Sequence, residues 1–127
     1  MILAAMDDLI FGVKIQEAAR RAGQPIEFTA RPEVALAKAR SFGAAGLGFR
    51  VIVDLNLRGV DTLELIRDLK AIPVTVIAYV AHVQVELRRG AELAGADQVL
   101  ARSAFVTKID QLVSLEREIM ATEKLPG

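Results

Sequence analysis

Short apolar segments alternate along the chain with longer segments in which apolar side chains recur at helical spacing. The short segments have the length of strands buried on both faces, and the pattern predicts five of them: Ile2–Met6, Ile26–Thr29, Val51–Leu55, Val74–Tyr79 and Asp97–Ala101. The spacing between them predicts five helices: from Leu9 to Gly23, over Glu33–Phe42, from Asp61 to Lys70, over Val83–Ala94 and over Phe105–Glu123. The pattern therefore indicates five consecutive β/α repeats.

Several helix boundaries carry end signals. Gly23 and Gly95 stand where a helix commonly ends in a left-handed residue, and Pro32 stands at the first position of a helix. Asp61, followed three residues later by a glutamate, forms a capping-box pattern. The glycine-rich segment 43–48 is interpreted as a flexible turn, because it precedes a strand instead of opening a helix after one.

Strands that are apolar on both faces and separated by helices form a parallel sheet that is covered on each side. We therefore expect an α/β fold of the flavodoxin-like, doubly wound (βα)5 type, with a five-stranded parallel sheet in the order 2-1-3-4-5 and helices on both faces. Residues 1–127 are expected to form one domain around one core, with residues 122–127 frayed. Ligands of such folds bind beyond the carboxyl ends of the strands.

The composition argues against several classes of function. The 16 basic and 16 acidic residues balance without a local basic patch, so neither a nucleic acid nor a membrane is an expected partner. One tyrosine, five phenylalanines and no tryptophan leave little aromatic surface for stacking a base or a flavin. Cysteine is absent, His82 is the only histidine, and no apolar stretch is long enough to span a membrane. A cytoplasmic location is expected.

Three carboxylates are predicted to meet at the carboxyl edge of the sheet. Asp7 and Asp8 end the first strand, and Asp54 ends the third. Neighbouring carboxylates repel one another unless a cation neutralises them, and oxygen ligands of this kind suit Mg²⁺. A carboxylate beside Mg²⁺ can also accept a phosphoryl group. The alternative interpretation is structural, because aspartates at such positions often cap a helix or a turn.

Three segments together resemble the receiver domains of bacterial response regulators, over nearly the whole chain. Residues 53–65, with the sequence VDLNLRGVDTLEL, resemble the pattern D-L-x-L-P-G-x-D-G-x-E-L around the phosphoacceptor of that family. Ile2–Asp8 resembles its first strand with the terminal acidic pair, and Ala94–Asp97 resembles the A-G-A-D before its fifth strand. The resemblance implies that Asp54 is the phosphoacceptor. It also implies a Mg²⁺ site made by Asp7, Asp8, Asp54 and the backbone carbonyl of Asn56.

Other positions depart from the receiver pattern. The hydroxyl residue after strand four aligns with Ala78, and the switching aromatic of strand five aligns with Val99. The lysine that follows aligns with Arg102, and the proline after it with Ser103. Arginine keeps the charge but pairs readily with carboxylates, so we expect Arg102 to reach the acidic edge and neutralise Asp54.

The last predicted helix carries an apolar stripe that packs on the sheet, and any surplus of it would form a homodimer or partner surface. The stripe consists of Leu112, Val113, Leu115, Ile119 and Met120.

The leading functional hypothesis is a stand-alone receiver-like module of two-component type. It would act by binding a protein, either a sensor kinase or a downstream effector, with a degenerate phosphorylation switch, and it would not be an enzyme. The alternative is a functional phosphoacceptor that receives a phosphoryl group on Asp54. A small flavodoxin-like enzyme or cofactor-binding protein is disfavoured, because no phosphate-cradling loop follows the first strand.

Overall fold

Five parallel strands form one sheet in the order β2-β1-β3-β4-β5, which confirms the predicted topology. The computed structural model describes residues 1–44, 49–81 and 84–114. The strands are β1 (Ile2–Ala5), β2 (Ile26–Thr29), β3 (Arg50–Asp54), β4 (Thr75–Val80) and β5 (Gln98–Ala101). Each predicted strand is present, with ends that differ by one residue at most.

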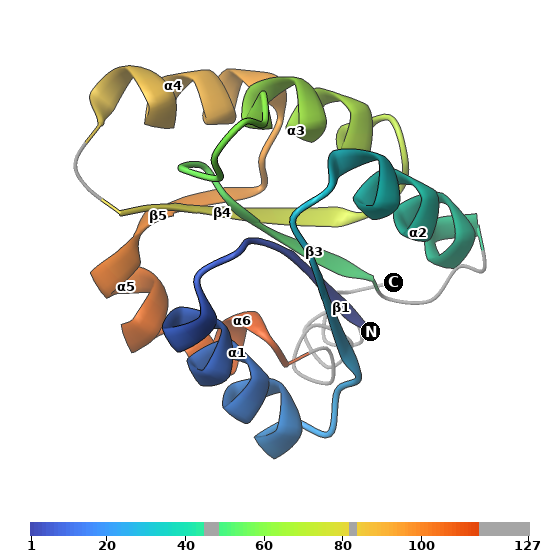
Figure 1. Ribbon diagram of the computed structural model, residues 1–127, viewed down its shortest axis with the longest axis vertical. Coiled ribbons are helices and arrows are strands. Elements are labelled where there is room, and N and C mark those ends of the chain that lie inside the picture. Colours follow the sequence, from blue (N-terminus) through green and yellow to red (C-terminus); the bar gives the residue numbers. More distant parts are fainter. Residues whose placement is uncertain (45–48, 82–83, 115–127) are drawn as a thin grey trace, which may run out of the picture.

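Helices cover both faces of the sheet (Figure 1). They are α1 (Leu9–Arg21), α2 (Pro32–Ala44), α3 (Thr62–Lys70), α4 (Val85–Ala94), α5 (Arg102–Thr107) and α6 (Ile109–Leu112). Helices α2, α3 and α4 lie on one face, and α1, α5 and α6 lie on the other. The two faces of the central strands therefore belong to two separate apolar layers.

The apolar alternation along β4 shows how the layers are built. Val76 and Ala78 pack toward α2, α3 and α4, whereas Ile77 and Tyr79 pack toward α1, α5 and α6. All four side chains are at most 1% exposed. Burial on both faces explains why the strands appear in the sequence as continuous apolar runs.

Three predicted helix ends are confirmed. The Asp61 carboxylate accepts a hydrogen bond from the Glu64 amide at 3.0 Å and caps α3. Gly95 ends α4 in the left-handed conformation, with a φ of 108°, and Pro32 is the first residue of α2. The same end signals that define the repeats in the sequence therefore set the lengths of these helices.

Two predicted elements need correction. The last helix does not begin at Phe105 and run on unbroken: α5 begins at Arg102, and Lys108, with a φ of −102° and a ψ of 8°, separates it from α6. The stripe residues Leu112 and Val113 are buried, and the rest of that prediction lies outside the described residues, as does the tail. Gly43 lies in the last turn of α2, not in a loop, and packs close to Ile72.

Across the part of the chain that the structure describes, no helix is long and apolar enough to cross a membrane.

Candidate functional site

The carboxyl ends of four neighbouring strands form a hollow at one edge of the sheet. β1 lies beside β3, so the acidic pair that follows β1 emerges next to Asp54, the last residue of β3. β5 lies beside β4, and Arg102 follows β5 at the same edge. The hollow has a volume of about 390 Å³ and is lined by Asp7, Asp8, Asp54, Asn56, Arg58, Tyr79, Ala81 and Arg102. The fold thus brings together all four residues of the Mg²⁺ site that the resemblance implies.

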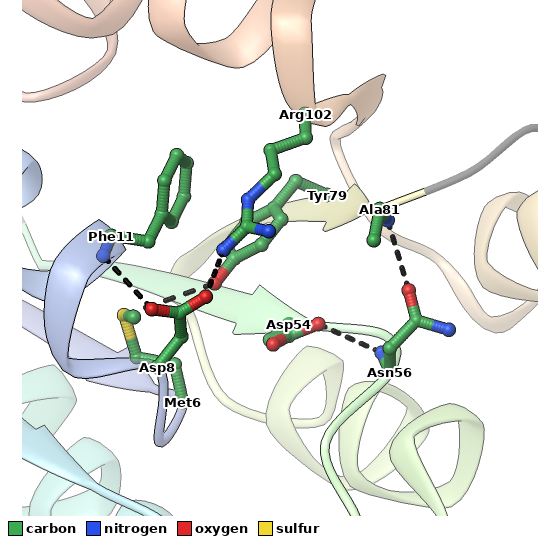
Figure 2. A network of polar contacts seen from close by, with 8 residues as sticks. All are labelled: Met6, Asp8, Phe11, Asp54, Asn56, Tyr79, Ala81 and Arg102. Carbon is green, nitrogen blue, oxygen red and sulfur yellow. Dashed lines mark hydrogen bonds and ion pairs between the residues drawn. The ribbon is translucent and has the colours of Figure 1, made fainter.

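Asp8 binds both the start of α1 and the start of α5 (Figure 2). One carboxylate oxygen accepts a hydrogen bond from the Phe11 amide at 3.0 Å, which caps α1. The other oxygen forms an ion pair with the guanidinium of Arg102. The Phe11 amide and, secondly, Arg102 hold the pKa of Asp8 below its usual range. Helix capping, the structural alternative considered for this aspartate, is therefore confirmed at Asp8.

The Arg102 side chain lies between α1 and the hollow. Its guanidinium carbon is 4.3 Å from the centroid of the Phe11 ring, in cation–π geometry. Arg102 reaches the acidic edge, and its ion pair there is with Asp8 rather than Asp54. Arg102 still acts on Asp54 through space, since its charge lowers the pKa of that carboxyl.

Asp54 is nearly buried at the end of β3, with 8% of its surface exposed. One of its oxygens accepts a hydrogen bond from the Asn56 amide at 2.8 Å, which fixes the turn after the strand. Burial is the largest influence on this carboxyl and raises its pKa, and the charges of Asp7 and Asp8 raise it further. The Asn56 amide and Arg102 only partly offset this effect. Arg102 pairs with Asp8, so its charge acts on Asp54 only through space.

The Asn56 side chain joins the loop after β3 to the loop after β4. Its carboxamide oxygen accepts a hydrogen bond from the Ala81 amide at 2.9 Å, and its nitrogen donates to the Gln84 carboxamide at 2.7 Å. Sequence reasoning gave Asn56 a role only through its backbone carbonyl and missed this bridge. The signal available was the type of residue, because a carboxamide can donate and accept at once.

The position predicted to replace the switching hydroxyl also needs correction. Ala78 lies inside β4, opposite Val53 in the register, and is fully buried beneath α3 and α4. β4 continues to Val80, so the residue that follows it and lines the hollow is Ala81. Ala81 has no hydroxyl either. Val99, the other substituted switch position, is buried in the same apolar layer as Ala78.

Among the described residues that line the hollow, only Tyr79 carries a hydroxyl. This hydroxyl donates to the sulfur of Met6 at 3.8 Å (Figure 2). The tyrosine ring packs against Phe11 and Phe105 at centroid distances of 4.9 and 5.1 Å. Burial, followed by the charge of Asp54, raises the pKa of Tyr79. The phenol is thus directed toward a thioether and packed in an aromatic cluster beneath the site.

Arg58 is a further lining residue that sequence reasoning missed. Its signal was present in the resemblance, because Arg58 stands where the receiver pattern has proline. The hollow is therefore lined by two guanidinium groups as well as three carboxylates. His82 lies outside the described residues.

The hollow does not present a ready Mg²⁺ site. Within residues 1–44, 49–81 and 84–114, no group of three carboxylate, histidine or cysteine side chains is arranged to hold a metal ion. The physical reason lies at Asp8, where one oxygen is engaged by the Phe11 amide and the other by Arg102. A divalent cation would have to enter beside a guanidinium that is already paired with Asp8.

The chain is similar in structure to receiver domains. No family model and no curated protein matches it. A response regulator from Burkholderia pseudomallei, solved with a phosphorylated aspartic acid, a calcium ion and citrate, matches with a TM-score of 0.72 and 24% identity, over 98% of this chain and 72% of the other. A response regulator receiver domain from Rhodospirillum rubrum matches with a TM-score of 0.72 and 23% identity, over 94% of each chain.

A third similar structure is the receiver domain of a sensor histidine kinase from Pseudomonas aeruginosa, solved with a magnesium ion coordinated in its active-site cleft. It matches with a TM-score of 0.68 and 19% identity, over 88% of this chain and 95% of the other. The class of fold is therefore the flavodoxin-like parallel α/β sandwich. Within that class, the chain has the CheY-like fold of response-regulator receiver domains.

Proposed function

We propose that this protein is a receiver-fold signalling module of two-component type that binds a protein partner without a phosphorylation-driven switch. The observation that carries the proposal is the place of Ala81 after β4, at the hollow that contains Asp54. A phosphoryl group on Asp54 would meet a methyl group there, and the Ala81 amide already donates to Asn56. No hydroxyl is present to draw in the loop after β4. The charge of the phosphoryl group would therefore interact about equally with the two conformations of that loop and would hardly shift the equilibrium between them.

Exposed apolar side chains support a role in binding. Leu9, Ile10 and Val13 on α1 are 85%, 80% and 55% exposed, and Phe28 on β2 is 40% exposed. Leu9, Val13 and Phe28 line one hollow of about 240 Å³ between α1 and β2. Apolar side chains gathered on the surface of a soluble domain commonly mark protein contacts. A sensor kinase, a downstream effector or a second copy of the chain is the expected class of partner, and the cytoplasm is the expected location.

A second candidate function is that of a working phosphoacceptor. The observation that favours it is that Asp54 shares its hollow with Asp7, Asp8 and Asn56, the residues implied for a Mg²⁺ site. In this case Asp54 would attack the phosphoryl donor and Mg²⁺ would offset charge on the phosphoryl oxygens. The ion pair between Asp8 and Arg102 would have to open first.

Labelling with acetyl phosphate separates the two candidates. The protein is incubated with acetyl phosphate and Mg²⁺, and its intact mass is measured beside that of Asp54→Asn and of Asp61→Asn, an exposed capping aspartate. We expect the wild-type chain and both variants to stay unmodified, because the ion pair between Asp8 and Arg102 would have to open before Mg²⁺ could assist the transfer. Stoichiometric addition of one phosphoryl group to the wild type and to Asp61→Asn, but not to Asp54→Asn, would establish the second candidate instead.

A further inference from the structure

We propose that the guanidinium of Arg102 is the resident cation of the acidic hollow and takes the place of a divalent metal. In the wild-type protein the hollow would then bind Mg²⁺ only weakly. The inference rests on the proposed function only in treating this hollow as the receiver-type site. It concerns the ligand chemistry of the site, which the fold alone does not fix.

Several contacts hold the Arg102 side chain in place. As the first residue of α5, directly after β5, it starts from a fixed backbone position at the edge of the hollow. Its guanidinium is paired with Asp8 and covered by the ring of Phe11. Its side chain is 34% exposed, and its Nε atom is buried without a hydrogen-bond partner. The ion pair and the covering ring hold this pose more firmly than an exposed surface ion pair would, and they outweigh the cost of the unsatisfied Nε.

The negative charge inside the hollow is already partly compensated. Three carboxylates line it, and Arg102 and Arg58 also line it. Arg102 offsets the charge of Asp8 directly, so a divalent ion would meet a site whose negative charge is already partly compensated. Each guanidinium also repels the incoming metal.

Several of the carboxylate oxygens that Mg²⁺ would need already accept hydrogen bonds. Mg²⁺ requires near-octahedral oxygen ligands at short distances and gives up its water reluctantly. The Asp8 carboxylate is oriented by the Phe11 amide on one oxygen and by Arg102 on the other. The Asp54 carboxylate is in turn fixed by the Asn56 amide. Metal binding through Asp8 would therefore require the protein to give up the ion pair that already neutralises this carboxylate.

A Mg²⁺ titration with matched variants tests the inference. Mg²⁺ binding is measured by amide NMR and by thermal unfolding at constant ionic strength for the wild type, Arg102→Gln and Arg21→Gln. Arg21 is the control, because it forms an ion pair with Asp110 away from the hollow. We expect Arg102→Gln to bind Mg²⁺ at least about tenfold more tightly than the wild type, with amide shifts around Asp54 and a higher melting temperature in Mg²⁺. Arg21→Gln should behave as the wild type.

Equal Mg²⁺ affinity of the wild type and Arg102→Gln, or an equal gain in Arg21→Gln, would overturn the inference. If Arg102→Gln does not fold, the wild-type titration decides alone: saturable submillimolar Mg²⁺ binding at the hollow overturns the inference, and its absence supports it. These outcomes are independent of the acetyl phosphate result. Tight Mg²⁺ binding by a wild type that is not phosphorylated on Asp54 would overturn the inference about Arg102 and leave the proposed function standing. Phosphorylation of Asp54 in a wild type that binds Mg²⁺ weakly would overturn the proposed function and leave the inference about Arg102 standing.

Discussion

Arg102 forms its ion pair with Asp8 and not with Asp54, although both carboxylates line the same hollow. The pairing links the first turn of α5 to the first turn of α1, on the side of the sheet where Phe11, Tyr79 and Phe105 pack together. Asp54 is left with a backbone hydrogen bond and a neighbouring positive charge that does not touch it. The contributions of the two carboxylates to the stability of the fold therefore change in opposite directions with pH, and this difference can be measured.

Substitution of Asp8 should separate its two contacts. Asp8→Asn retains an oxygen that can accept from the Phe11 amide but loses the ion pair with Arg102, whereas Asp8→Ala loses both. In urea unfolding at neutral pH we expect the wild type to be most stable and Asp8→Ala least. Because the folded pKa of Asp8 is depressed, its contribution is present above the ordinary value of 3.8 and is lost as the pH falls through the folded pKa. Equal stability of the two variants would contradict this assignment.

Asp54→Asn should raise stability at neutral pH. The folded pKa of Asp54 lies above its ordinary value of 3.8, because burial disfavours the charged form. The contribution of Asp54 to the unfolding free energy should therefore fall as the pH rises from below 3.8 through the raised folded pKa, and the advantage of Asp54→Asn over the wild type should grow over the same interval.

Asp97→Asn is the matched control for that measurement. The Asp97 carboxylate accepts from the Lys70 ammonium at 2.8 Å and from the Val76 amide at 2.7 Å, at the opposite edge of the sheet. Loss of this charge should lower stability or leave it unchanged. A destabilised Asp54→Asn at neutral pH would show that the buried carboxylate contributes favourably to the fold.

Asn56→Ala should loosen the loop after β4. The Ala81 amide would lose its acceptor, at a cost of about 1 kcal/mol, and its hydrogen exchange should accelerate. Gln84→Ala removes only the exposed contact to the Asn56 side chain, so its effect should stay within about 0.5 kcal/mol. Unchanged exchange at Ala81 in Asn56→Ala would contradict the bridging role.

Tyr79 is the only tyrosine, so its ionisation can be followed by absorbance alone. Its raised pKa predicts no tyrosinate signal near the ordinary value of 10.0 while the chain is folded. Unfolded chains ionise there, so stability should fall as the pH rises through 10.0, and the signal should appear together with unfolding by circular dichroism. Tyrosinate formation at that pH with an unchanged circular dichroism spectrum would contradict the burial of the phenol.

The repeat pattern of the fold could be predicted because local signals and global topology agree. Asp61 and Gly95 fix helix ends through their own backbone and capping chemistry, and the apolar runs require a covered parallel sheet. The break at Lys108 could not be predicted in the same way. Ile109 and Leu112 continue the helical spacing of apolar residues, so the pattern does not show where the backbone hydrogen bonding is interrupted.

The site was harder to predict than the fold, because its details depend on register and on competing side-chain partners. The residue types at the edge were evident, but the continuation of β4 to Val80 decides that Ala81, and not Ala78, lines the hollow. Asp7, Asp8 and Asp54 all carry a carboxylate at this edge, so the residue types alone do not show which of them pairs with Arg102. In the structure its guanidinium packs over Phe11 and pairs with Asp8. Side-chain pairing of this kind depends on the tertiary structure, and the spacing of residue types in the sequence does not predict it.

The central claim, that the receiver fold here lacks a phosphorylation-driven switch, is tested most directly by amide NMR with beryllofluoride and Mg²⁺, a mimic of a phosphoryl group on Asp54. We predict that the amide resonances of Tyr79, Ala81 and the residues from Gln84 to Phe105 stay essentially unshifted, because no hydroxyl follows β4 at the hollow and Arg102 remains on Asp8. Widespread shift changes across β4, α4 and β5 that Asp54→Ala abolishes would contradict the claim and show a working receiver.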